Sequence, residues 1–163
     1  MPVFARTGRI VDDNWHLWDG NQELSSIEGG ILLLPELWQT HRSQLLDSNR
    51  TLGLIIHLDQ QLIDCQEDLG HFNLIVINFT AFSNGQGFSM ATLLRERYGF
   101  RGELRASGDI LFDQLFYLKR CGFDSFELDD EIDRTEITKA LNSFSEGYQQ
   151  ACDQPLPLFR WRT

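Results

Sequence analysis

The amino-acid sequence predicts an α/β protein whose mostly parallel sheet is either open or bent into a partial barrel. Between residues 73 and 128, strand-like apolar runs alternate with helix-like stretches in the order strand, helix, strand, helix, strand. The central run, LIVINF, is almost continuously apolar, which is typical of a strand covered on both faces. A closed eight-unit barrel needs about 250 residues. The 163 residues of this chain therefore suit one smaller domain.

The first thirty residues differ from the rest of the chain. Thr7 and Gly8 stand between VFAR and RIV, a pattern that predicts a tight β hairpin. We expect residues 1–29 to form a small β lobe on one edge of the sheet. A single α/β domain is predicted over residues 1–154, with a C-terminal tail at residues 155–163.

About five βα units are predicted from Gly30 onward. Their strands are expected at ILLL, LGLIIHL, LIVINF, RGELRASG and FDSFEL. The helices are expected from Pro35 to Leu46, from Gln60 to Leu69, after an N-cap at Ser89, after an N-cap at Asp109, and from Glu136 to Tyr148.

Composition and charge narrow the classes of function. The net charge of −10 argues against nucleic acid or an anionic membrane as a partner, unless a local basic patch provides the contact. No apolar run approaches the ~18 residues of a membrane helix, and the N-terminus lacks a signal-peptide core. The three cysteines have no spacing typical of disulfide frameworks or metal centres. We expect a cytoplasmic protein that holds no metal, and the sequence leaves any cofactor unknown.

Polar residues at the ends of the predicted strands are the first candidates for a site, because parallel sheets place their working groups there. Histidine could act as a general base at such a position, although nothing in the sequence places a nucleophile beside it. These candidates are His57, Asn78, Arg105, Ser107, Asp109 and Glu127.

The segment from Arg105 to Asp109 predicts a site for a small oxyanion or a phosphate group. Arg105 offers a fork of N–H donors, Gly108 allows close approach, and the expected helix start offers backbone N–H groups. The anion-binding candidates are Arg105, Ser107, Gly108 and Asn78. A structural interpretation stays open: Arg105 alternates with Glu103 on its strand and lies one strand away from Glu127, with which it could form a buried or half-buried ion pair.

The loop between the central strand and the next helix contains Gly85 and Gly87, followed by Ser89. Glycines in this setting resemble a dinucleotide-binding fingerprint, but Met90 occupies the third glycine position and the loop is long. Binding of NADPH, with Arg105 receiving the 2′-phosphate, stays an alternative. The loop could instead need glycine for its backbone angles, or could cover the site as a lid.

Two further segments have both a structural and an interface interpretation. Acidic residues dominate from Asp124 to Glu136, which indicates either a solvated loop and helix start or a docking face. The tail PLPLFRWRT could pack on its own domain or anchor a partner.

Cys121 is expected in the core, because it shares a helical face with Leu111, Leu115 and Leu118.

Four motifs are specific enough to indicate a family: FSNGQGFS, LLRERYGFRGELRA, GDILFDQL and RCGFDSFEL. With these motifs the chain resembles the bacterial domain-of-unknown-function family 934, over most of its length. Members are commonly described as candidate oxidoreductases of assimilatory sulfite reduction. That resemblance implies a role in the same pathway but names no catalytic residue. Sulfite reductases hold sirohaem and an iron–sulfur cluster through four thiolates, so a chain with three cysteines is not their catalytic subunit by itself.

Three hypotheses follow from these observations. The first is an accessory protein of sulfite assimilation that binds a small oxyanion at the corner from Arg105 to Gly108. The second is a non-catalytic adaptor that docks on sulfite reductase or its electron-donor protein. The third is an NADPH-dependent reductase.

Overall fold

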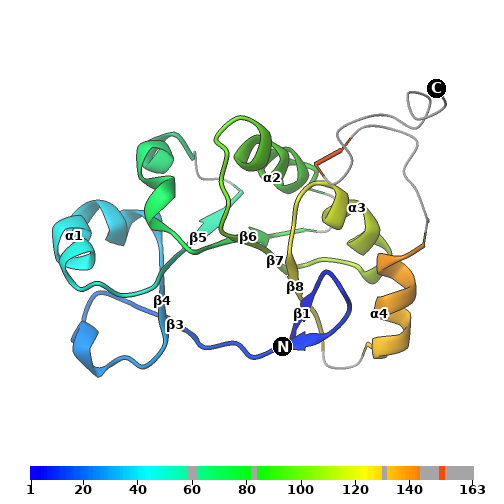
Figure 1. Cartoon of the computed structure of the whole chain (residues 1–163), viewed down its shortest axis with the longest axis horizontal. Helices are drawn as coiled ribbons and strands as arrows, with labels where there is room; N and C mark the ends of the chain where they lie inside the picture. Colours follow the sequence, from blue (N-terminus) through cyan, green and yellow to red (C-terminus); the bar gives the residue numbers. More distant parts are fainter. Residues whose placement is uncertain (59–61, 82–83, 130–131, 144–150, 153–163) are drawn as a thin grey trace.

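The computed structural model describes residues 1–58, 62–81, 84–129, 132–143 and 151–152. Within them the chain forms an α/β structure on one curled sheet (Figure 1). The strands are β1 (Val3–Ala5), β2 (Ile10–Val11), β3 (Trp15–Leu17), β4 (Gly30–Leu33), β5 (Leu52–His57), β6 (Leu74–Phe79), β7 (Glu103–Gly108) and β8 (Ser125–Glu127). The α-helices are α1 (Pro35–Asp47), α2 (Gln86–Glu96), α3 (Leu115–Arg120) and α4 (Arg134–Leu141), and the 3-10 helices are η1 (Leu24–Ser26), η2 (Leu62–His71) and η3 (Phe112–Gln114).

The strand order is β2-β1-β8-β7-β6-β5-β4-β3. Strands β3 to β8 pair in parallel, whereas β1 runs antiparallel to both β2 and β8. The five predicted βα units are present, each strand from β4 to β8 being followed by a helix. The prediction of a mostly parallel sheet, either open or bent into a partial barrel, with an N-terminal hairpin is therefore confirmed.

Helix boundaries follow local sequence signals. Helix α1 begins at Pro35, whose missing N–H costs nothing in a first turn. Helix α4 begins at Arg134 because the carboxylate of Asp133 accepts the N–H of Thr135 at 2.9 Å. The last helix was expected over residues 136–148, so its start is two residues earlier than predicted, and residues 144–148 lie outside the described ranges.

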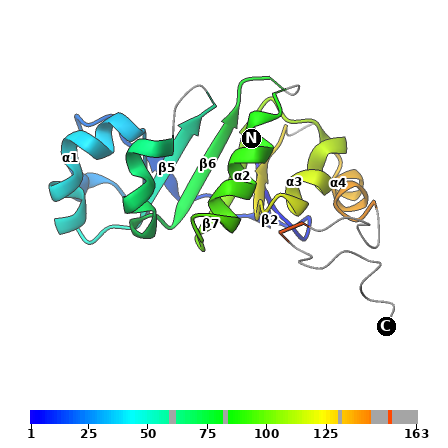
Figure 2. The ribbon, with the colours of Figure 1, turned by 90° about the horizontal axis from the view of Figure 1, so that it is seen from above.

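The outer face of the sheet carries the main apolar core. On β6, Ile75, Ile77 and Phe79 belong to one buried cluster together with helical residues such as Ala91 and Leu94 of α2. Figure 2 shows α2, α3 and α4 in a row over this face. None of the helices in the described ranges is long and apolar enough to span a membrane. Because the helices cover one face, the polar residues of the parallel strands collect on the other, inner face.

The N-terminal segment crosses the inner face of the sheet. Trp15 lies over Gly30 and Gly53, where a Cβ atom at Gly30 would come within 2.5 Å of the indole ring. Residues 12–14 join β2 to β3, which are the two opposite edge strands of the sheet, and the chain crosses the open side of the curl (Figure 1). The N-terminal residues, which we expected on one edge, therefore occupy both edges.

Candidate functional site

The carboxyl ends of β5, β6 and β7 bring three predicted residues together. His57, Asn78 and Ser107 are register partners on the inner face. Ser107 Oγ donates to Asn78 Oδ1 over 3.4 Å, and Asn78 Nδ2 lies 3.1 Å from His57 Nδ1. An amide nitrogen can only donate, so Nδ1 of His57 accepts and the proton of the neutral ring is on Nε2. This hydrogen-bonded row fixes the orientation of an imidazole, as general acid–base chemistry or ligand binding requires.

The chain turns sharply at Gly108, beside this row. Gly108 has φ +86°, and a Cβ atom there would collide with the Phe79 carbonyl and the Asn78 side chain. The N–H of Asp109 then donates to Phe79 O at 2.8 Å, which carries the chain along the end of β6. The predicted helix start at Asp109 is wrong for this reason, since the first helical residue is Phe112. The helix N–H groups expected beside Gly108 do not lie there.

Arg105 lies inside an ion-pair network on the inner face, with its side chain 4% exposed. Its Nη1 contacts Asp13 Oδ1 at 2.9 Å and its Nη2 contacts Glu103 Oε1 at 3.1 Å. Its Nε lies 3.3 Å from both Glu103 Oε1 and Ser125 Oγ, and Ser125 donates to Glu103 at 2.5 Å. In the described part of the chain, the ion-pair partners of Arg105 are Asp13 and Glu103, rather than Glu127.

This network favours a structural role for Arg105 over anion binding. Two carboxylates face one guanidinium, and each of its three nitrogens already donates. A further anion would meet excess negative charge and few unused donors. Glu127 lies on the same face, paired in register with Val3 on β1.

The glycine-bearing loop leads into α2, whose first residue is Gln86. Asn84 Oδ1 accepts the N–H of Gln86 at 3.0 Å, and Gly85 is the N-cap residue. The predicted N-cap at Ser89 is therefore wrong, and Ser89 is an exposed residue within the helix. Gly87 is required by packing, because a Cβ atom there would enter the ring of Phe79. Residues 82–83 of the expected lid lie outside the described ranges.

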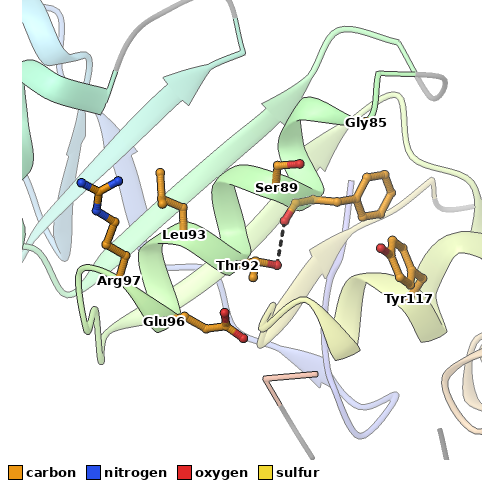
Figure 3. A pocket seen from close by; sticks show the side chains of 8 residues that line it. Gly85, Ser89, Thr92, Leu93, Glu96, Arg97 and Tyr117 are labelled. Atoms are coloured by element: carbon orange, nitrogen blue, oxygen red, sulfur yellow. Dashed lines mark hydrogen bonds between the residues drawn. The ribbon is translucent and has the colours of Figure 1, made fainter. Parts of the chain in front are cut away.

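A pocket of about 480 Å³ lies along the outer side of α2, facing α3. Figure 3 shows Ser89 and Glu96 on α2, with Tyr117 opposite them on α3. Phe88 lies between the pocket and the core, with its ring centroid 5.5 Å from Phe79 and 5.1 Å from Tyr117. The predicted loop residues Gly85 and Ser89 therefore line one pocket with Phe88 and Tyr117, which were not predicted as site residues.

Three large side chains on the segment from Leu111 to Tyr117 are exposed, and we call them the exposed apolar edge. Tyr117 is 57% exposed, Phe112 is 47% exposed and Leu111 is 41% exposed. Leu111 was expected on the buried face of one helix with Cys121, but η3 and α3 are separate helices, and Leu111 precedes both. Tyr117 had a usable signal, since it lies between Leu115 and Leu118 and falls off the buried face that they define.

The burial of Cys121 and the pKa values of Tyr117 and Cys152 bear on whether this region could be reactive. The expectation that Cys121 belongs to the core is confirmed, as it is 7% exposed. The pKa of Tyr117 is raised, first by electrostatic interaction with Cys121 and then by burial. Burial also raises the pKa of Cys152, with a further contribution from the Glu96 carboxylate. The raised pKa of Cys152 disfavours a reactive thiolate at neutral pH.

The acidic segment that begins at Asp124 forms local contacts in the structure. Asp124 does not belong to a solvated acidic face, because it pairs with Arg95 and, at 3.4 Å, with Arg6. Asp133 caps α4. Among the described residues, no group of three or more His, Cys, Asp or Glu side chains could hold a metal ion.

Comparison with protein-family models identifies a family. The family model described as "Bacterial protein of unknown function (DUF934)" matches residues 53–159, which confirms the resemblance seen in the motifs. No curated protein and no solved structure matches the chain.

Proposed function

The chain belongs to the DUF934 family, and from that premise we propose that it is an accessory protein of assimilatory sulfite reduction that works by docking on a partner protein. The pathway rests on the resemblance of its motifs to this family. The mode of action rests on one observation, the exposed apolar edge formed by Leu111, Phe112 and Tyr117.

That edge has the composition of an interface anchor. Tyr117 and Phe112 expose about half of their surface, although residues of this size are usually buried. Phe88 connects Tyr117 to Phe79 in the core, so the exposed ring stands on a rigid support. Rigid, well-supported aromatic side chains are the residues that most often dominate the affinity of protein interfaces.

Charges around the edge indicate the chemistry of the partner. Phe112 shares another pocket with Asp113, Glu136 and Lys139, whereas Glu96 and Arg97 line the pocket between α2 and α3, so three acidic side chains stand beside two basic ones. With a net charge of −10, the chain would attract a partner surface that combines apolar and basic side chains. Sulfite reductase and its electron-donor protein are the partners we propose, as components of the pathway that the resemblance implies.

The test is a binding titration of the purified chain against sulfite reductase and, separately, against its electron-donor protein. Tyr117→Ala should weaken binding by at least about tenfold, as expected for an interface anchor. Leu17→Ala is the matched control, because Leu17 is 62% exposed on β3, at the far edge of the sheet. It should leave the affinity unchanged.

The dependence on salt sharpens this test. The association rate should fall as salt rises if acidic groups steer the encounter. Failure of both proteins to bind, or equal affinities for the Tyr117→Ala and Leu17→Ala variants, would remove the docking role of this edge.

A further inference from the structure

A second pocket, of about 320 Å³, lies beyond the amino ends of β7 and β8, at the end of these strands opposite to Ser107. Three arginines line it, namely Arg6, Arg95 and Arg101. Two carboxylates, those of Glu96 and Asp124, also line it. The pocket therefore carries excess positive charge in a chain whose net charge is −10.

Arg95 holds a fixed positive charge in the wall of this pocket. Its Nε donates to Gly122 O, and its Nη1 donates to the carbonyls of Phe100 and Gly102, each over 2.9 Å. Its Nη2 pairs with the carboxylate of Asp124. Carbonyl groups orient the guanidinium without removing its net charge, so Asp124 is the one carboxylate of the described residues that neutralises it.

Asp124 is already shared between several donors. One of its oxygens accepts from Arg95 and from the N–H of Leu104, and the other contacts Arg6 Nη1 at 3.4 Å. The side chain of Arg101 is exposed and forms no ion pair or hydrogen bond with the described residues. Among the described residues, Arg6 and Arg101 therefore keep guanidinium donors that no acceptor fills.

We propose that this pocket binds a small oxyanion, of the size of sulfate, sulfite or phosphate. Arg6 and Arg101 would contact the oxygens, and Arg95 would supply a fixed positive charge beside them. Planar guanidinium forks match pairs of anionic oxygens, and charge-assisted hydrogen bonds of this kind are stronger than neutral ones. The proposal does not depend on partner docking: Glu96 lines both pockets, but Arg6, Arg95 and Arg101 do not line the pocket that contains Tyr117.

The contrast with Arg105 explains why we place the anion at this end. Arg105 is 4% exposed on its side chain and is faced by two carboxylates, whereas Arg6 is 44% exposed and shares one carboxylate with Arg95. An incoming anion would thus meet unused donors beside Arg6 and excess negative charge beside Arg105. The oxyanion expected at the corner from Arg105 to Gly108 has a better electrostatic site between Arg6 and Arg101.

The experiment is calorimetric titration of the full chain with sodium sulfate, sulfite and phosphate at constant ionic strength. A separate titration with NADPH distinguishes a free anion from the phosphate group of a larger molecule. Arg6→Gln and Arg101→Gln should each weaken anion binding by at least about tenfold, which is 1.4 kcal/mol. Both side chains are exposed, so neither substitution should unfold the protein.

Two control variants decide where the anion binds. Arg97→Gln removes an exposed arginine that lines the pocket between α2 and α3, and it should leave the affinity unchanged. Ser107→Ala removes a hydroxyl from the carboxyl ends of the strands, and it should also leave the affinity unchanged.

Three results would overturn the proposal. One is the absence of heat up to about 10 mM of every anion, tenfold above a Kd of about 1 mM. Another is equal binding by the wild type and the Arg6→Gln/Arg101→Gln double variant. The third is loss of binding in Ser107→Ala, which would place the anion at the carboxyl end instead.

Discussion

The inner face around Arg105 and the amino end around Arg95 each hold a largely buried arginine, but they neutralise it differently. Arg105 is surrounded by two carboxylates and a hydroxyl, whereas Arg95 is held by three backbone carbonyls and one carboxylate that it shares with Arg6. An arginine is therefore available to an anionic ligand only when few carboxylates contact its guanidinium group. A position on a strand near the carboxyl end of a sheet does not by itself make an arginine available.

Arg95→Ala should produce the largest effect, because it removes a side chain that ties the end of α2 to the segments before β7 and β8. It leaves the carbonyls of Phe100, Gly102 and Gly122 and the Asp124 carboxylate without their donor. We expect the free energy of unfolding to fall by about 3–5 kcal/mol, measured by urea denaturation. Arg97→Ala on the same helix end is the control, and it should cost less than ~0.5 kcal/mol. Equal costs for the two variants would refute this account of Arg95.

Arg105→Met should destabilise the protein less, by about 2–4 kcal/mol in the same measurement. It leaves Glu103 and Asp13 without their cation, but these side chains are 33% and 43% exposed and water can hydrate them. Asp13→Asn, which keeps Glu103 as the partner of Arg105, should cost only about 0.5–1 kcal/mol. Oxyanion binding should survive Arg105→Met. Its loss in a folded variant would show that the inner face, and not the amino end, holds the ligand.

The smallest expected effect is a change in the reactivity of Cys152, which lines the arginine pocket. Its raised pKa means that the neutral thiol is favoured, so less thiolate is present at pH 8 than in the unfolded chain. Alkylation of the Cys152 peptide by iodoacetamide, followed by mass spectrometry, should be slower in the native protein than in urea and should accelerate as pH rises. Glu96→Gln should speed the native reaction, because it removes a nearby negative charge. A native rate equal to that in urea would contradict the raised pKa.

Local patterns predicted the sheet and missed its tertiary ion pairs. The run LIVINF coincides with β6, and Thr7 and Gly8 form the turn of the β1–β2 hairpin, because apolar continuity and glycine backbone angles are local properties. Asp13 and Arg105 are 92 positions apart, and no local pattern pairs them. The N-cap predictions at Ser89 and Asp109 failed because Asn84 and the turn at Gly108 set the chain path instead.

One part of the candidate site was predictable from the sequence and another part was not. Parallel-strand geometry was sufficient to bring His57, Asn78 and Ser107 together from three separate segments. The pocket between α2 and α3 depends on how two helices pack, which residue spacing within one helix does not reveal. An aromatic residue off the buried face of its helix, as at Tyr117, was the one available signal.

The pairing of β1 with β8 has a consequence for the order in which the chain folds. Arg6 and Asp124, beside this pairing, are 118 positions apart, so the first strand cannot complete its contacts until most of the chain has been synthesised. Such long-range closure raises the contact order and slows folding relative to a protein built from local contacts. The units from β4 to β7 can assemble from neighbouring segments, and closure of the curl by the N-terminal residues is then expected to be the late step on the ribosome.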